Sequence, residues 1–401
     1  MTKETAIKSL LDALKGFHGR FKLLYGQVAL RINEDTYLMS GGNKLLSGIV
    51  EDDLVICNIN DGDFAAIFSS RPDINAFIFG CSPDTVEISN ELKALPTMLE
   101  DAAQLAGAQI PVADSAKPND ILICLDKSDI CFIKGIGAVA VGRTAKNAVS
   151  SIHILHKECE AYIHGKMLDG AKPFDPALAE KIKANYTSNY VPTNNSEHQV
   201  DYIGFEEDDF NLRNGVIEAG KNLIKDDLVF GTSGNLSMRL GEDEMLISPS
   251  SMDYFDTHVE DIVRISINDL DPGKQRIPSS DADLHAKMYQ FIPGCNAIIH
   301  THSNACSVFA ACEAGFAITD PNLKQLIGDV RVVPYTPDDP RATMVNTLAT
   351  LSDTHAAILP HHGAIFYGPS LEIVHEIAKS VEMMARNLLQ YNAKAEDEEQ
   401  A

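Results

Sequence analysis

The chain of 401 residues is 45% hydrophobic and 22% charged, which excludes a collagen, a coiled coil and a mainly disordered protein and predicts two or three domains. Its 33 basic and 57 acidic residues give a net charge of −24, which argues against nucleic acid and anionic membrane surfaces as partners. No apolar run approaches the roughly 18 residues of a membrane-spanning helix. The segment MTKETAIKSL lacks the apolar core of a signal peptide, and the 8 cysteines form no CxxC pair. We therefore expect a cytoplasmic protein.

In chain order, the predicted elements are short β runs mixed with helices. Gly135–Gly142 is predicted to be a buried strand, and Gly165–Asp209 has the composition of a linker with one helix at Pro176–Tyr186. A helix is predicted over Phe210–Lys225. Another is predicted over Ser370–Leu389, because apolar residues recur there every three or four positions. Strands and helices joined by hairpin-like turns favour a layered α/β fold.

The second half of the chain repeats the first. Gly26–Ser40 and Gly234–Ser248 are identical at six of fifteen positions, at a constant offset of 208 residues. The offset grows to 221 at Asn75 and to 226 at Gly137, while the order of the matching segments is kept. Shared order over most of each copy predicts a tandem duplication.

A His-x-His pair lies in an apolar run of the second copy. On a strand, His300 and His302 share one face about 7 Å apart, and a zinc ion with bonds of about 2.0–2.1 Å fits between them. A third histidine, in the pair His361-His362, directly precedes Gly363. Three neutral imidazoles leave a coordination position for substrate, which is typical of a catalytic metal. The first copy has no histidine at the aligned positions, which are Phe79, Cys81 and Ile136.

Turns rich in Ser and Gly offer donors for an anion. Gly231–Ser237 has backbone N–H groups, hydroxyls and one amide, and Ser248–Ser251 and Pro278–Asp281 each add hydroxyl pairs. Ordinary turns remain the alternative for any one of these segments. In the first copy the first two segments have different residues, and the third is deleted where the offset grows by 13. The metal and anion features are therefore lost together, as expected if one copy lost a shared active site.

These motifs together resemble the class II aldolase/adducin family and follow its order. The resemblance covers the second copy almost end to end and the first more faintly. It implies an α/β protein of tandem three-layer α/β/α domains with mainly antiparallel central sheets. The predicted domains are a degenerate copy without metal ligands at 1–165, a linker at 166–209, a metal-binding copy at 210–393 and an acidic tail at 394–401.

The resemblance also implies which residues form the site. His300, His302 and His362 would bind Zn²⁺ or another divalent metal such as Mn²⁺ or Co²⁺, and His361 is not expected to be a ligand because the family's ligand directly precedes Gly. Ser251 stands where the family often has Gly. The residues expected to hold a substrate phosphate are Asn235, Ser250, Ser251, Ser279 and Ser280.

Asp281 is the candidate catalytic residue, and two roles remain open for it. Fuculose-phosphate-type aldolases carry Glu at this position as an acid/base, whereas L-ribulose-5-phosphate 4-epimerase carries Asp as a metal ligand. Asp320 lies near where a second proton-transfer group of an epimerase would fall, but a loop carboxylate without catalytic duty is the favoured interpretation. His285 is expected to be structural.

The resemblance implies a metal-dependent aldehyde-lyase that cleaves a phosphorylated ketose by retro-aldol chemistry through a metal-stabilised enediolate. The alternatives are an L-ribulose-5-phosphate 4-epimerase-like enzyme, a sugar-phosphate dehydratase or decarboxylase, and an adducin-like binding or scaffold protein. The complete histidine set favours an enzyme. Family enzymes commonly form fourfold rings, so we expect a homo-oligomer in which two chains of two copies form a pseudo-fourfold ring.

Overall fold

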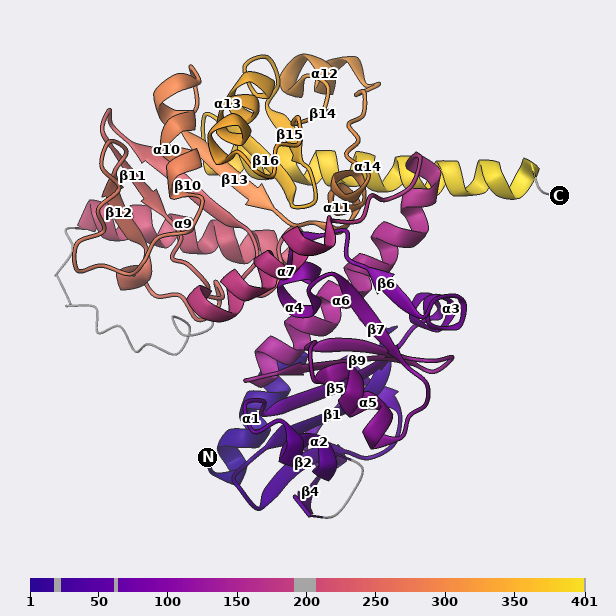
Figure 1. Ribbon diagram of the computed structural model, residues 1–401. Helices are drawn as coiled ribbons and strands as arrows, with labels where there is room; N and C mark the ends of the chain where they lie inside the picture. The colour runs from indigo at the N-terminus through magenta and orange to yellow at the C-terminus, as the bar shows by residue number, and fades with distance from the viewer. Residues whose placement is uncertain (18–22, 61–63, 191–206, 400–401) are drawn as a thin grey trace. The chain divides into compact units, whose positions relative to one another are not determined.

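Two sheets organise the chain (Figure 1), and the first has the strand order of the second plus two short additional strands. The computed structural model describes residues 1–17, 23–60, 64–190 and 207–399, so the polar run Thr193–Gln199 lies outside the described residues. Unit 1 consists of Met1–Ile163 and Pro173–Ser188, and unit 2 consists of His164–Lys172 and Asn189–Ala401.

The sheet of unit 1 has the order β4-β2-β1-β5-β9-β8-β7-β6, and the short strand β3 also pairs with β1. Its strands are β1 (Tyr25–Arg31), β2 (Thr36–Ser40), β3 (Lys44–Leu45), β4 (Leu54–Asn58), β5 (Ala76–Cys81), β6 (Ala94–Pro96), β7 (Gln109–Ala113), β8 (Ile130–Ile133) and β9 (Gly137–Gly142). The helices of this part of the chain are α1 (Lys3–Leu14), α2 (Ala65–Ser70), α3 (Pro83–Glu91), α4 (Glu100–Ala106), α5 (Pro118–Leu125), α6 (Ala145–Gly165) and α7 (Pro176–Asn185).

The sheet of unit 2 has the order β12-β11-β10-β13-β16-β15-β14. Its strands are β10 (Asn235–Leu240), β11 (Glu244–Ile247), β12 (Val263–Ser266), β13 (Ala297–Thr301), β14 (Arg331–Val332), β15 (Ala356–Leu359) and β16 (Gly363–Gly368). Its helices are α9 (Glu207–Lys225), α10 (Ala282–Phe291), α11 (Asn304–Ala311), α12 (Pro321–Ile327), α13 (Pro340–Thr350) and α14 (Leu371–Glu399).

The two sheets show the duplication at the level of single residues. Both are antiparallel except for one parallel pair near one edge, β7 with β8 and β14 with β15. Asn235 pairs with His300 in unit 2, and Gln27 pairs with Phe79 in unit 1. These are the positions that the sequence repeat aligns, although the insertion lies between the two strands. The predicted tandem duplication is therefore present in the fold.

Helices cover both faces of the unit 2 sheet. Side chains of α10, such as Ala286 and Tyr289, pack in one core with Ile298 of β13 and Ile365 of β16. A Cβ added at Gly368 would meet α14 on the opposite face of β16, at Val374. Because residues i and i+2 of a strand share a face, His300 lies on the α10 side with Ile298. This arrangement is the expected three-layer α/β/α domain.

Most predicted elements lie where the sequence places them. β9 is buried at every residue, and α9 begins three residues before Phe210. Helix α14 continues beyond Leu389 to Glu399, within the predicted acidic tail. The linker helix α7 packs with unit 1, where its Glu180 accepts a hydrogen bond from Ala108 N. The domain limits 1–165 and 210–393 remain our proposal for the extent of the copies. Within the described residues, no helix combines the length and apolar character needed to cross a membrane.

Candidate metal centre

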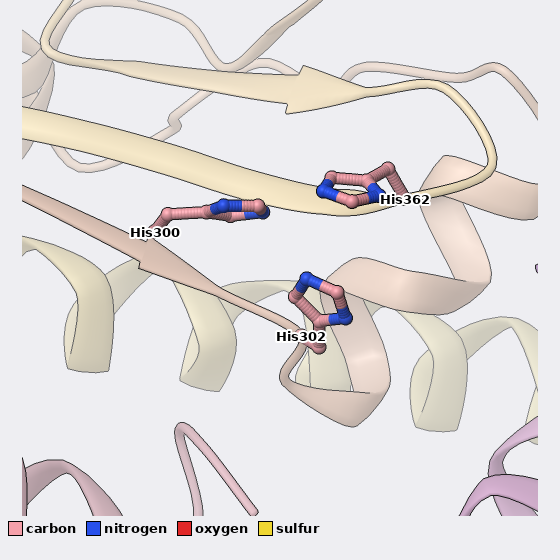
Figure 2. Close-up of side chains that lie close together, drawn as sticks. All are labelled: His300, His302 and His362. Atoms are coloured by element: carbon pink, nitrogen blue, oxygen red, sulfur yellow. The ribbon is translucent and has the colours of Figure 1, made fainter. Parts of the chain in front are cut away.

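Three histidines from two strand ends converge in unit 2. His300 is the penultimate residue of β13, His302 follows that strand, and His362 ends the turn between β15 and β16. Because β13 pairs with β16 through Thr301 and Ala364, this turn lies beside the end of β13. Figure 2 shows the three rings turned toward one another, and their centroids are 4.6 to 4.8 Å apart.

The two adjacent histidines of the turn have different surroundings. His361 adopts a left-handed φ of +61° and is buried, with its Nε2 3.4 Å from Glu313 Oε1 and its ring 4.6 Å from the ring of Tyr335. The N–H of His362 donates to Leu359 O and closes the turn. Only His362 faces His300 and His302, which agrees with the expectation that His361 is not a ligand.

Gly363 is required by the close approach of β16 to β13. A Cβ at this position would lie 2.2 Å from Thr301 O and 3.3 Å from a ring carbon of His302. A side chain here would push the turn that carries His362 away from the other two rings. The sequence signature of a histidine followed by glycine therefore has a steric cause.

Gly363→Ala is expected to lower the free energy of unfolding by about 1–3 kcal/mol, because overpacking against backbone forces the strands apart. It should also weaken divalent-metal binding, because His362 moves with the turn. Thermal unfolding and a metal titration measure both effects. Gly215→Ala is the control, since a Cβ there meets nothing within 4 Å and helix α9 gains about 0.5–1 kcal/mol from alanine. Wild-type stability in Gly363→Ala would contradict the steric account.

Two polar side chains, those of Asp281 and Asn235, lie beside Nδ1 of His300. Its Nδ1 is 2.7 Å from Asp281 Oδ2, and Asn235 Nδ2 donates to the same oxygen at 2.7 Å. Burial raises the pKa of Asp281, but the hydrogen bond with His300 outweighs it, and the pKa of this carboxyl lies well below its usual range. The carboxylate is therefore held against Nδ1 of the His300 ring.

The residues present fit a divalent metal ion. One ligand atom from each of His300, His302 and His362 lies within 4.8 Å of the other two, and among the described residues these three form the group suited to hold a metal. Three nitrogens at about 2.1 Å from one ion lie about 3.4 Å apart, so small ring movements close the set. His300 Nε2 is buried and has no hydrogen-bond partner among the described residues. A buried ring nitrogen without a hydrogen-bond partner is available to coordinate a metal ion.

The serine segments predicted for anion binding are adjacent in space. Pro249 and Pro278 form an isolated β-bridge, Ser250 N donates to Ile277 O, and Ser279 N donates to Ser248 O. Ser279 is buried and its Oγ accepts from Asp281 N, which joins these segments to the metal centre.

The other three predicted phosphate residues differ in exposure and conformation. Ser280 is exposed, whereas Ser250 and Ser251 are partly buried, with their hydroxyl oxygens 3.4 Å apart. Ser251 has a φ of +58°, a conformation that favours glycine, which explains why the family often has Gly at this position. Ser233 bonds within its own turn, to the N–H and carbonyl of Phe230.

A buried hydrogen-bonded group lies beside the centre on α10. His285 Nδ1 is 2.8 Å from Ser237 Oγ, which is 2.6 Å from the hydroxyl of Tyr289. His285 is fully buried, and burial lowers the pKa of its ring to about 4, which keeps the ring neutral at pH 7. This network agrees with the structural role expected for His285. Asp320 caps α12 by accepting from the N–H groups of Asn322 and Leu323, the structural duty of a loop carboxylate.

Sequence reasoning missed Glu382, a buried carboxylate on α14. It accepts hydrogen bonds from Ala305 N at 2.9 Å and Cys306 N at 3.0 Å, at the first turn of α11. The N-cap residue Ser303 makes no side-chain cap bond, so Glu382 takes that role and fixes the turn directly after His302. The available signal was an acidic residue on the otherwise apolar face of the predicted C-terminal helix.

Glu382→Gln is expected to lower the free energy of unfolding by about 1–3 kcal/mol, because an amide offers only one acceptor to two buried N–H donors. Urea unfolding of the purified variants measures the effect. Glu376→Gln is the matched control, because Glu376 is exposed on the same helix. Equal losses in the two variants would rule out a specific cap.

Comparison with known proteins agrees with the geometry. The profile of the class II aldolase and adducin N-terminal domain matches residues 12–163 and again residues 214–389. A 5-deoxy-D-ribulose 1-phosphate aldolase from Bacillus thuringiensis is 28% identical over 179 residues, which cover 43% of this chain and 82% of the relative. An L-fuculose phosphate aldolase from Haemophilus influenzae is 31% identical over 185 residues, 43% of this chain and 80% of the relative.

A solved L-fuculose 1-phosphate aldolase is 29% identical and matches with a TM-score of 0.42, covering 46% of this chain and 87% of that structure. The two profile matches coincide with the two sheets, which share an order of seven strands. The chain therefore belongs to the class II aldolase and adducin family and contains the family's domain twice.

Proposed function

We propose that this protein is a metal-dependent aldolase that cleaves a phosphorylated ketose by retro-aldol chemistry. The observation that carries the proposal is the convergence of His300, His302 and His362, with ligand atoms within 4.8 Å of one another, in a member of this family. An adducin-like scaffold would have no use for three histidines held together in this way. The first copy has Phe79, Cys81 and Ile136 at the aligned positions, so we assign the metal to the second copy.

The proposed division of labour follows from the chemistry of the side chains. When bound, a divalent metal supplies Lewis-acid chemistry, polarising a ketose carbonyl and stabilising the negative charge that develops as the neighbouring carbon–carbon bond breaks. The three imidazoles hold the ion through neutral nitrogens and leave a position for the substrate. The remaining residues of the site orient the substrate by groups remote from the reacting carbons.

The two adjacent serine segments are the proposed phosphate subsite. Their closeness is supported by the Pro249–Pro278 bridge, and backbone N–H groups and hydroxyls are the donors that bind phosphate without a net positive charge. This suits a chain with a net charge of −24. The proposed phosphate-binding side chains are Asn235, Ser250, Ser251, Ser279 and Ser280.

The proposed substrate class is supported by the relatives, whose names specify 5-deoxy-D-ribulose 1-phosphate and L-fuculose phosphate. We therefore expect a ketose 1-phosphate, which retro-aldol cleavage converts to dihydroxyacetone phosphate and an aldehyde. Zinc-loaded protein is incubated with a panel of ketose 1-phosphates, and dihydroxyacetone phosphate is measured with an NADH-linked reductase. Interconversion of ketose phosphates without cleavage would replace this proposal with an epimerase. Loss of water or carbon dioxide would indicate a dehydratase or decarboxylase.

The duplication supports a proposal about assembly. Soluble chains form closed symmetric oligomers, and a chain with two copies of one domain reaches pseudo-fourfold symmetry as a homodimer. Mass measurement in solution is expected to give twice 43.7 kDa. A stable monomer with full activity would remove this part of the proposal.

A further inference from the structure

The carboxylate of Asp281 does not make the hydrogen bonds that its position in the fold predicts. Asp281 is the N-cap residue of α10, where an aspartate normally accepts from the N–H groups of the first helical turn. Its side chain makes no such bond. Instead Oδ2 receives Asn235 Nδ2 and faces His300 Nδ1, both at 2.7 Å. The first turn of α10 therefore lacks a side-chain cap, and the carboxylate contacts the ring of His300 instead.

The contact determines which nitrogen of His300 carries the proton. Because Asp281 Oδ2 already accepts from Asn235 Nδ2, the His300 ring at 2.7 Å from this oxygen presents an N–H at Nδ1. A neutral imidazole then has its lone pair at Nε2, the atom that is buried without a partner among the described residues. Asn235 donates to the same oxygen and holds the carboxylate in place.

We infer that Asp281 is a positioning residue that fixes the tautomer and orientation of His300 for metal binding. The inference rests on the metal centre of the proposed function and extends it to the role of Asp281. Carboxylates that accept from the second ring nitrogen of a ligand typically change metal affinity 10–100-fold.

A second observation comes from the degenerate copy. Phe79 replaces His300, Gln27 replaces Asn235 at the paired strand position, and the segment that would carry Asp281 is deleted. A residue that acts through the His300 ring has no function once that ring is replaced. The loss of all three residues in one copy is what a single functional unit predicts.

The experiment compares wild type with Asp281→Ala, Asp281→Asn and Asp281→Glu. Zn²⁺ affinity is measured by competition with a chromophoric chelator, and the tautomer of His300 in metal-free protein by long-range ¹⁵N–¹H NMR, assigned with His300→Gln. Asp283→Ala is the matched control, because Asp283 is exposed on the first turn of the same helix. Thermal unfolding of each variant verifies that it is folded.

We expect the Nδ1–H tautomer in wild type, loss of that preference in Asp281→Ala and an affinity about 10–100-fold weaker. Asp281→Asn should fall between, since its amide oxygen still accepts from Nδ1. Asp281→Glu should also bind Zn²⁺ more weakly, because the longer side chain displaces the carboxylate. Wild-type affinity and tautomer in Asp281→Ala would overturn the inference, as would wild-type turnover in Asp281→Glu. If wild type shows the tautomer but cleaves no ketose phosphate, the proposed function fails and the inference about His300 stands.

Discussion

Replacing His300 with alanine is expected to remove the bound metal and to lower kcat/KM for a cleaved ketose phosphate by about a thousandfold or more. Lewis-acid stabilisation of a developing oxyanion contributes several kcal/mol, and about 4 kcal/mol corresponds to a factor of about 10³ in rate. His300 is the most buried of the three histidines at 1% exposed, and its Nδ1 contacts Asp281 Oδ2, which Asn235 also holds. The loss of His300 therefore leaves two imidazole ligands, which are too few to hold a catalytic metal ion.

Elemental analysis of protein purified without chelator measures the first effect. We expect one divalent metal per chain rather than two, because only unit 2 retains the histidines. Chelator treatment of wild type should abolish activity, and Zn²⁺, Mn²⁺ or Co²⁺ should restore it. His258→Ala is the control, since the His258 side chain is 78% exposed. Unchanged metal content in His300→Ala would show that the three rings do not form the centre.

The sequence predicted the fold well because the duplication supplied an internal comparison. Strand pairing keeps its register when a loop grows. Phe79 of the first copy and His300 of the second therefore remain equivalent positions, although an insertion lies between the paired strands. The same comparison distinguished the three histidines that the first copy lacks at the aligned positions from the other histidines of the chain. Without this comparison, a single segment such as Gly231–Ser237 would have been interpreted as an ordinary turn.

Other features depend on contacts that no local pattern contains. Whether Asp281 caps α10 or turns to His300 is decided by strand β13, which lies 19 residues away in the chain. Glu382 caps α11 through the N–H of Ala305, which lies 77 residues earlier in the chain. The different exposures of Ser279 and Ser280 likewise follow from the bridge between Pro249 and Pro278. Such choices are made when distant segments pack, so sequence spacing alone leaves them open.

The stability of the protein is expected to fall by up to about 3 kcal/mol as the pH decreases from about 6.5 to about 4, because of His285 alone. Burial lowers the pKa of this ring to about 4; the charge of Asp281 opposes the shift and that of His300 adds to it. In the unfolded chain a histidine titrates near 6.5, so between these values the unfolded state binds more protons than the folded state. Stability therefore rises with pH in this window, by about 1.4 kcal/mol for each unit of pKa difference.

Urea unfolding at a series of pH values between 7 and 4 isolates this effect when wild type is compared with His285→Asn. The asparagine oxygen takes the place of Nδ1 beside Ser237 but does not titrate, so the variant should be less stable at pH 7 and lose less stability on acidification. His258→Asn, which removes an exposed ring, should follow the wild-type curve. A total stability of about 5–15 kcal/mol makes a loss of 3 kcal/mol easy to measure. Parallel curves for wild type and His285→Asn would mean that the ring beside the metal centre is protonated as readily in the folded protein as in water.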